Sequence, residues 1–211
     1  MKLQILSGLI LASLCSLALA DAANEVDQLQ HSWAHVNYEL DGDAQLEAFA
    51  ALADTANSAT QAYPDDAGVW IWSGIIKSTF AGAKGGLGAL GLAKESKRDL
   101  EQAMKLDADA LDGSAYASLG TLYYSVPGWP VGFGDDKKAE ELLQKALALK
   151  PDAIDNNYFY ASYLVEKKRY DEARDYFTRA QNAPARPNRP VADAGRQQEI
   201  KLALEDLQGR H

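Results

Sequence analysis

Apolar residues recur with the spacing of an α-helix along most of this chain. Between residues 139 and 149 they share one face of a helix with about 3.6 residues per turn, and Pro151 follows as a helix-ending residue. This face consists of Ala139, Leu142, Leu143, Ala146 and Leu149. A matching face follows about 34 residues later, at Ala173, Tyr176, Phe177 and Ala180. A step of about 34 residues is the period of a helix–turn–helix repeat, so the pattern predicts a repeat protein.

A partner helix is expected before each of these segments. The first carries Tyr116, Leu119, Gly120 and Tyr123, and the second carries Tyr160, Ala161 and Leu164. The aromatic-xx-Leu-Gly-xx-Tyr series from Tyr116 to Tyr123, the Ala–Leu–Ala–Pro series to Pro151 and the string Tyr170-Asp-Glu-Ala173 resemble the motif of the tetratricopeptide (TPR) family. The resemblance is specific over residues 111–180. It implies an all-α, TPR-like solenoid of helical hairpins that acts as a binding scaffold.

The segments before this region also have helical patterns. Residues 21–40 predict a helix with the buried stripe Val26, Leu29, Trp33 and Val36, and residues 44–62 predict its partner. A further pair begins at Asp65-Asp66 and ends near Leu106. Residues 81–92 and 126–134 exceed the regular repeat, and we expect loops there, because insertions in repeat arrays map to loops.

The chain after Ala185 no longer follows the repeat. A turn-rich break from Arg186 to Pro190 precedes an amphipathic helix over residues 191–207. Its apolar positions are Ile200, Ala203, Leu204 and Leu207. We expect this helix to cap the last repeat, since the terminal unit of a solenoid leaves one apolar face open.

The first twenty residues have the features of a signal peptide. Lys2 precedes an apolar run from Leu3 to Leu19, and Ala18-Leu19-Ala20 has the form of a cleavage site. We therefore expect residues 21–211 to form a single mature domain in the periplasm. Cys15 is the only cysteine in the chain and lies within this leader, so a cleaved chain has no thiol or disulfide. Lipidation at Cys15 is the alternative, although Leu14 stands where a small residue is expected.

The charge of the chain limits its partners. The formal net charge is −9, which disfavours nucleic acid and anionic membrane surfaces. Positive and negative residues are mixed along the helices, as on solvated helix faces. Neither nucleic-acid binding nor membrane insertion after leader cleavage is expected.

Three patterns that could indicate a nucleotide site, a metal site or a catalytic serine have simpler explanations. Gly86-Leu-Gly88-Ala-Leu-Gly91 matches a dinucleotide fingerprint but lacks the strand–turn–helix context, so we expect a packing device and no cofactor. His31, His35 and Glu39 share one helix face, yet Ser32 stands where H-E-x-x-H requires glutamate, so no metal site is expected. No Gly-x-Ser-x-Gly elbow is present. The protein is therefore predicted not to be an enzyme.

The resemblance implies which residues line the concave groove. Fixing Gly74, Gly120 and Ala161 at the eighth place of each first helix carries the family's groove positions onto this chain. They are Ile71, Ile75, Ser78 and Thr79, then Ser114, Ala117, Thr121, Tyr124 and Ser125, then Asp155, Tyr158, Ser162, Val165 and Glu166. No lysine, arginine or asparagine occurs among them, so the family's clamp for C-terminal carboxylates is absent.

The loop at residues 127–134 adds two aromatic side chains, Trp129 and Phe133. Trp129 is expected to pack against the next repeat, or the two rings form a lid over the groove. The predicted binding residues are Trp72, Ser78, Thr121, Tyr124, Trp129, Phe133, Asp155, Tyr158 and Ser162.

These patterns predict an exported, non-catalytic scaffold that binds another envelope protein or a peptide through its groove. The alternative is a small-molecule carrier or transport accessory for an apolar solute, because exported TPR proteins with such insertions look similar to the TRAP-transporter T component. The space among Trp72, Tyr124, Trp129 and Tyr160 discriminates between them. A flat open groove favours a peptide, and a closed aromatic pore favours a small apolar solute.

Overall fold

The protein is an array of helical hairpins. The computed structural model describes residues 5–210, with side chains from Asp21 onward except that of Leu87. Within this range the helices are α1 (Ile5–Glu39), α2 (Gly42–Ala62), α3 (Ala67–Lys84), α4 (Gly86–Leu106), α5 (Ala110–Ser125), α6 (Asp136–Leu149), α7 (Ile154–Glu166), α8 (Tyr170–Gln181) and α9 (Pro190–Asp206). The predicted all-α, TPR-like solenoid with a C-terminal helix is confirmed.

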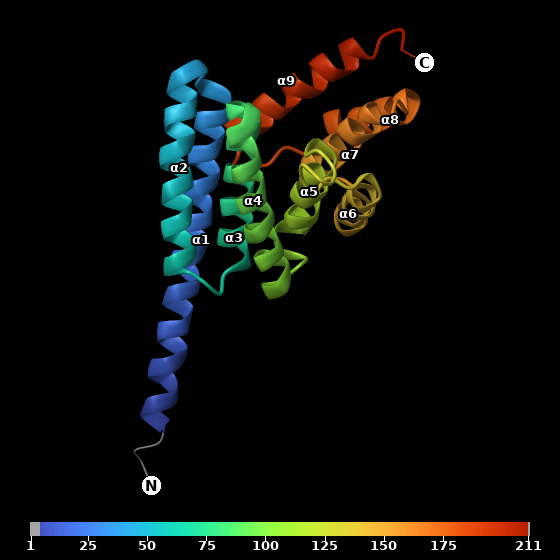
Figure 1. The fold of residues 1–211 in the computed structure, drawn as a ribbon. Coiled ribbons are helices and arrows are strands. Elements are labelled where there is room, and N and C mark those ends of the chain that lie inside the picture. Colours follow the sequence, from blue (N-terminus) through green and yellow to red (C-terminus); the bar gives the residue numbers. More distant parts are fainter. Residues whose placement is uncertain (1–4, 211) are drawn as a thin grey trace.

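The hairpins stack in chain order (Figure 1). The most extensive helix contacts join α3 to α4, α5 to α6 and α7 to α8. The first helices of these pairs also touch in series, α3 with α5 and α5 with α7, and they form the inner wall. At one end α1 and α2 pack on α3. The predicted stripe of α1 is buried at Val26, Leu29, Trp33 and Val36.

Two glycines set the distance between paired helices. A Cβ atom built on Gly120 would lie 2.8 Å from Leu143 Cγ, and one built on Gly74 would lie 2.6 Å from Leu100 Cγ. Neither position has room for a larger side chain, because protein interiors are close-packed. These contacts confirm the repeat register deduced from the sequence, in which both glycines take the same place.

The predicted loop at residues 81–92 is wrong. In the structure α3 continues to Lys84 and α4 begins at Gly86, so the extra residues lengthen both helices of one hairpin. The turn consists of Gly85 and Gly86, with φ angles of 60° and 62°, a conformation that glycine adopts without steric cost. Alanine and leucine on either side favour helix, which explains why the helices extend up to the glycine pair.

The loop after α5 forms as predicted. Its ends meet through backbone hydrogen bonds, with Gly134 N donating to Pro127 O at 3.0 Å and Asp135 N donating to Tyr123 O at 2.9 Å. The Asp135 carboxylate then accepts from Lys138 N at 3.1 Å and caps α6. Hydrogen bonds therefore join the two ends of the loop, and the loop leads directly into α6.

The C-terminal helix does more than cap the last repeat. Ile200 and Leu207 are buried, and the Arg174 guanidinium on α8 donates to Leu207 O at 3.1 Å, as a cap requires. The helix also packs against α7 and against α1 at the opposite end of the array. Figure 1 shows α9 running from the end of the array that holds α1 to α4 across to α8. This crossing was not expected from the sequence.

The predicted leader falls largely outside the described side chains. Residues 1–4 are not described, and residues 5–20 continue α1 toward the N-terminus. Signal-peptide cleavage and export stay predictions. Over the described residues, no helix combines the length and apolarity needed to cross a membrane.

Candidate ligand-binding site

The concave side of the solenoid contains a partly open cavity of about 750 Å³. The inner helices α3, α5 and α7 supply most of its wall, α4 and the loop after α5 contribute one side, and α1 and α9 complete it. Five aromatic side chains line it, namely Trp33, Trp72, Tyr124, Tyr158 and Phe159. A cavity of this size with mostly apolar walls is typical of small-molecule sites.

Most of the predicted groove residues do line this cavity. They are Ile75, Ser78, Thr79, Ser114, Ala117, Thr121, Tyr124, Ser125, Asp155, Tyr158 and Ser162. Three predicted residues do not, Ile71, Val165 and Glu166. Ile71 is fully buried between helices, and the other two lie in the last turn of α7. That the other residues bind a ligand stays a prediction.

The hydroxyl groups on the wall are largely occupied by their own helices. Ser78 Oγ donates to Ile75 O at 2.8 Å, Thr121 Oγ1 donates to Ala117 O at 2.9 Å and Ser162 Oγ donates to Tyr158 O at 2.9 Å. Such local bonds use the single hydroxyl proton. The wall therefore offers a ligand fewer donors than its serines and threonines suggest.

Trp72, Tyr124, Trp129 and Tyr160, whose arrangement was expected to distinguish a peptide site from a small-molecule site, do not surround one space. Trp72 and Tyr124 line the cavity. Tyr160 is buried away from it, where its hydroxyl accepts from Gln144 Nε2 at 3.2 Å. Trp129 is 90% exposed. The aromatic wall is real, but Trp33, Tyr158 and Phe159 complete it in place of Tyr160 and Trp129.

The predicted burial of Trp129 is wrong, and the two loop aromatics do not form a lid in this structure. Gly128 and Pro130 hold Trp129 at the exposed tip of the loop, while Val126, Pro127 and Val131 of the same loop reach the cavity. Phe133 packs edge-to-face on Tyr123 with ring centres 5.6 Å apart. Phe133 therefore anchors the loop on the side away from the cavity.

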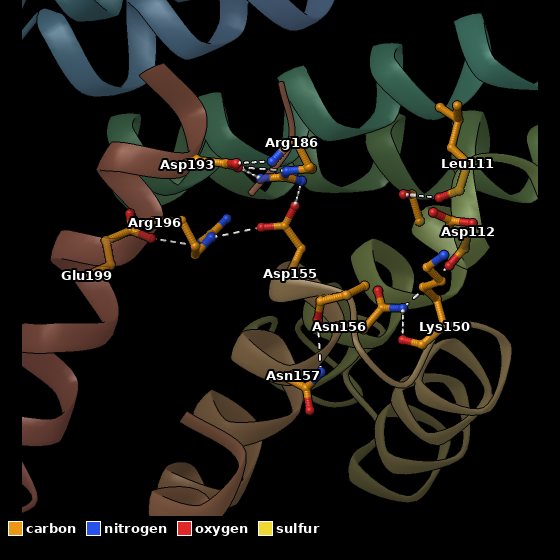
Figure 2. A network of polar contacts seen from close by, with 12 residues as sticks. Leu111, Asp112, Lys150, Asp155, Asn156, Asn157, Arg186, Asp193, Arg196 and Glu199 are labelled. Atoms are coloured by element: carbon orange, nitrogen blue, oxygen red, sulfur yellow. Dashed lines mark hydrogen bonds and ion pairs between the residues drawn. The ribbon is translucent and has the colours of Figure 1, made fainter. Parts of the chain in front are cut away.

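A network of charged side chains fastens α9 to α7 (Figure 2). Arg196 Nε on α9 donates to Asp155 Oδ1 on α7 at 2.9 Å. Arg186, in the segment before α9, donates from Nη1 to Asp155 Oδ2 at 2.6 Å and also pairs with Asp193. Arg196 pairs further with Glu199. Asp155 therefore accepts from two arginines at once, one through each oxygen.

These pairs fix the charge states of the network. Burial alone would raise the pKa of Asp155, but Arg196, Arg186 and Arg189 outweigh it and hold that pKa well below its usual range. Burial opposes the charge of Arg196 too, yet Asp155 beside it raises the pKa of Arg196. Both groups stay ionised at neutral pH. The predicted binding residue Asp155 is thus mainly a structural tie to α9.

Arg189 is the exception among the arginines of this region. It lines the cavity just before α9, and within the described chain it makes no ion pair and no side-chain hydrogen bond. Its Nε atom is buried without a partner. The guanidinium carbon lies 5.1 Å from the ring centre of Trp72, so the two groups form one corner of the cavity.

The sequence reasoning missed the cavity residues Asn37, Asn156, Arg189, Arg196 and Glu199. The groove rule applies only within repeats, and three of these residues follow the repeat region. Asn156 lies in α7, but its amide donates to Ala146 O at 2.8 Å and ties α7 to α6. The three arginines Arg186, Arg189 and Arg196 were the available signal, because basic residues are outnumbered by acidic ones in this chain, 21 against 30.

The other candidate sites are surface or packing features. His35 Nδ1 lies 2.6 Å from Glu39 Oε2 and His31 Nδ1 lies 2.8 Å from Asp27 O, all on the exposed face of α1. In the part of the chain with described side chains, no three histidine, cysteine or acidic residues cluster as metal ligands do. Gly86 opens α4 directly after the helix α3, without the strand that a dinucleotide site requires.

Comparisons with known proteins are limited to structures. No protein-family model matches the chain, and no curated protein does. The crystal structure of YrrB, a TPR protein with an unusual peptide-binding site, shares 17% identity, covering 80% of this chain and 82% of that chain, with a TM-score of 0.43.

Two further structures show similar values. MamA shares 14% identity, covering 87% of this chain and 92% of that chain, with a TM-score of 0.44. Pseudomonas aeruginosa PilF shares 14% identity, covering 88% and 99%, with a TM-score of 0.36. The similarity to the TRAP-transporter T component stays a prediction. The stacked hairpins and the two glycine contacts between paired helices identify the fold as a TPR-like solenoid.

Proposed function

We propose that this protein is a non-catalytic binding protein that holds a small, largely apolar ligand in the cavity of its solenoid. The observation that carries the proposal is the path of α9, which packs on both α1 and α7 and places Arg196 and Glu199 in the cavity wall. An open groove would admit an extended chain along the repeats. A partly enclosed cavity of about 750 Å³ suits a ligand of small-molecule size better than a long extended chain.

The chemistry of the wall supports the same choice. Aromatic rings from four different helices, α1, α3, α5 and α7, line the cavity, and the hydroxyls of Ser78 and Thr121 donate to their own helix backbones. Apolar surface that a ligand removes from water stabilises the complex by about 25 cal/mol per Å². Binding is therefore driven mainly by burial of the apolar body of the ligand.

A protein partner is the second candidate, and it would bind the exposed tip of the loop after α5. Trp129 is 90% exposed and Val131 is 63% exposed at the tip of one loop. Large apolar side chains gathered on a surface are common in contacts between proteins. In this version the protein acts as the predicted interaction scaffold, and the loop rather than the concave face makes the contact.

The cavity proposal is tested with a matched pair of substitutions. Ser78 lies on the cavity wall and donates to the backbone of its own helix, and exposed Ser58 on α2 does the same, at 3.0 Å to Asp54 O. Ser78→Phe fills the cavity, while Ser58→Phe adds the same ring outside it. We expect a neutral apolar fluorophore, N-phenylnaphthylamine, to bind the parent and Ser58→Phe saturably, and Ser78→Phe at least about tenfold more weakly. Equal binding by both variants contradicts the cavity as the site.

A further inference from the structure

The cavity contains a positive charge that no residue of the described chain neutralises by contact. Three arginines and three carboxylates meet at this end of the molecule. Asp155 accepts from Arg186 and Arg196, Asp193 pairs with Arg186, and Glu199 pairs with Arg196. All three carboxylates are thus engaged. Arg189 is left without a partner in this group.

The position of Arg189 determines which ligand group this unpaired charge can bind. Its guanidinium carbon lies 5.1 Å from the ring centre of Trp72, and both residues line the cavity. Trp72 is 3% exposed, and its indole Nε1 is also buried without a hydrogen-bond partner. Two N–H donor groups therefore lie unsatisfied at one corner of a mostly apolar space.

Unsatisfied donors of this kind are costly in a folded protein. A buried donor without an acceptor loses the full energy of its contact with water, and a charged group loses more. Burial and the neighbouring charge of Arg186 lower the pKa of Arg189, against the opposing effect of the Asp155 and Asp193 carboxylates. An arginine nevertheless keeps its proton at neutral pH. The corner consequently favours any ligand group that brings a negative charge and hydrogen-bond acceptors.

The same ion pairs disfavour a cationic ligand. An ammonium group would need a free carboxylate, and Asp155, Asp193 and Glu199 each already hold at least one arginine. The guanidinium fork of Arg189 matches the two oxygens of a carboxylate, which accept two parallel N–H bonds. Trp72 offers its ring as a stacking surface and its N–H as a further donor at the same corner.

We propose that the ligand of this cavity is a small organic acid, with a carboxylate bound by Arg189 at the Trp72 corner and an apolar body against the aromatic wall. This inference rests on the proposed binding function and specifies its ligand class. Arg189 then acts as the specificity-determining residue, while the aromatic wall supplies most of the buried area. The side chain of Arg189 makes no capping hydrogen bond to α9, so its replacement leaves the start of that helix intact.

The test compares two probes that differ only in charge. Naphthylacetic acid and its neutral amide, naphthylacetamide, have the same apolar body and nearly the same size. Isothermal titration at neutral pH gives the affinity of each for the full chain. We expect the parent to bind the acid about tenfold or more tightly than the amide, because only the carboxylate makes charge-assisted hydrogen bonds with Arg189.

Four variants locate that preference. Arg189→Gln should lose much more affinity for the acid than for the amide, and so lose the preference for the acid. Arg189→Lys keeps the positive charge but not the two-pronged guanidinium group, and should keep part of the preference for the acid. Trp72→Phe keeps the ring but removes the N–H, and should reduce the preference while the amide still binds. Arg98→Gln removes an exposed arginine outside the cavity and should behave as the parent does.

The outcomes separate the inference from the proposed function. If parent and Arg189→Gln bind acid and amide equally well, the carboxylate site is wrong and the apolar cavity site stands. A preference for the acid that survives Arg189→Gln also overturns the assignment to Arg189. If neither probe binds the parent up to millimolar concentration, the proposed function itself is contradicted. Circular dichroism of each variant shows whether the fold is retained, and Arg189→Lys decides the question if Arg189→Gln unfolds.

Discussion

Arg196 Nε and Asp155 Oδ1 lie 2.9 Å apart, and this contact joins the C-terminal helix to the inner wall of the repeats. Arg196 is 6% exposed and its guanidinium also stacks over Tyr158, with the carbon 4.1 Å from the ring centre. One side chain therefore closes the solenoid and orders a cavity residue. The contact between α9 and α7 is stable only while the buried arginines and carboxylates of this network neutralise one another.

We predict that Asp155→Asn destabilises the protein by about 2–3 kcal/mol, because it leaves two arginines without their shared acceptor. The matched control is Asp171→Asn on α8. Asp171 pairs with Arg174 at 2.7 Å, but its side chain is 83% exposed, so its loss should cost less than about 0.5 kcal/mol. Urea unfolding of the three proteins at pH 7 measures both values. Equal losses of unfolding free energy in the two variants would show that the buried network stabilises the protein no more than a surface ion pair does.

The same variant has a defined pH dependence. The folded-state pKa of Asp155 lies below its ordinary value of 3.8, so its contribution to stability is present above that value. It is lost as the pH falls toward the lower folded-state pKa. The difference in unfolding free energy between parent and Asp155→Asn should therefore be constant from about pH 5 to 7 and shrink below about pH 4. A difference that grows on acidification contradicts this assignment.

The register of the repeats is tested at Gly120. An added Cβ would lie 2.8 Å from Leu143 Cγ and 3.1 Å from Ala139 O, so Gly120→Ala should cost about 1–3 kcal/mol through overpacking. Gly91 is the control, because it lies within α4 and a methyl group added there would meet no atom within 4 Å. Gly91→Ala should raise stability by about 0.5–1 kcal/mol. Thermal unfolding that shows the same sign for both would disprove the close contact between Gly120 and Leu143.

Trp129→Ala should leave the free energy of unfolding within about 0.5 kcal/mol of the parent, because the indole is 90% exposed. Binding of the neutral fluorophore should not change either, since Trp129 is not part of the cavity lining. The measurements are thermal unfolding and fluorescence titration. A clear loss of stability would mean that the ring packs against the protein in solution, and weaker fluorophore binding would restore the predicted lid.

Export is predicted from the leader, independently of the fold. If Ala18-Leu19-Ala20 is cleaved after Ala20, mass spectrometry of the chain from the envelope fraction should give an N-terminus at Asp21. The control is Ala20→Pro, which should block cleavage at this site. A retained leader in the parent, or an acylated Cys15, contradicts cleavage at this site.

The sequence predicted the inner wall well because the repeat fixes it. Once Gly120 is placed at the contact between paired helices, the period of the helix determines that Tyr124 and Thr121 face inward. No such rule applies after Ala185. The apolar stripe of α9 with Ile200 correctly indicates packing on the last hairpin. It does not reveal the second contact, because Gly195 and Arg196, which face the far end and α7, have no apolar signature.

The extended hairpin of α3 and α4 was missed for a related reason. Comparing repeat lengths identifies extra residues but does not say whether they continue a helix or leave it. The glycine-rich composition of residues 81–92 favoured a loop, yet only Gly85 and Gly86 form the turn. The other glycines are tolerated inside helices that tertiary packing supports, as α3 against α4 does here.

The closure of the solenoid by α9 is tested most directly at Gly195. An added Cβ would lie 2.3 Å from Tyr38 Cδ1 on α1, too close for the two helices to keep their distance. Gly195→Ala should therefore move α9 away from α1, destabilise the protein by about 1–3 kcal/mol and weaken fluorophore binding by opening one side of the cavity. Gly91→Ala again serves as the control for a methyl group added to a helix.

A second substitution shows whether the effect comes from this contact. Tyr38→Ala removes the ring that the methyl group would strike, and the Tyr38 hydroxyl is buried without a hydrogen-bond partner, so little polar bonding is lost with it. In the Tyr38→Ala background, Gly195→Ala should cost at least about 1 kcal/mol less than in the parent. Strictly additive effects on unfolding and on fluorophore binding would mean that α9 does not rest on α1 in solution. The cavity would then be an open groove, and a peptide partner would become the better assignment.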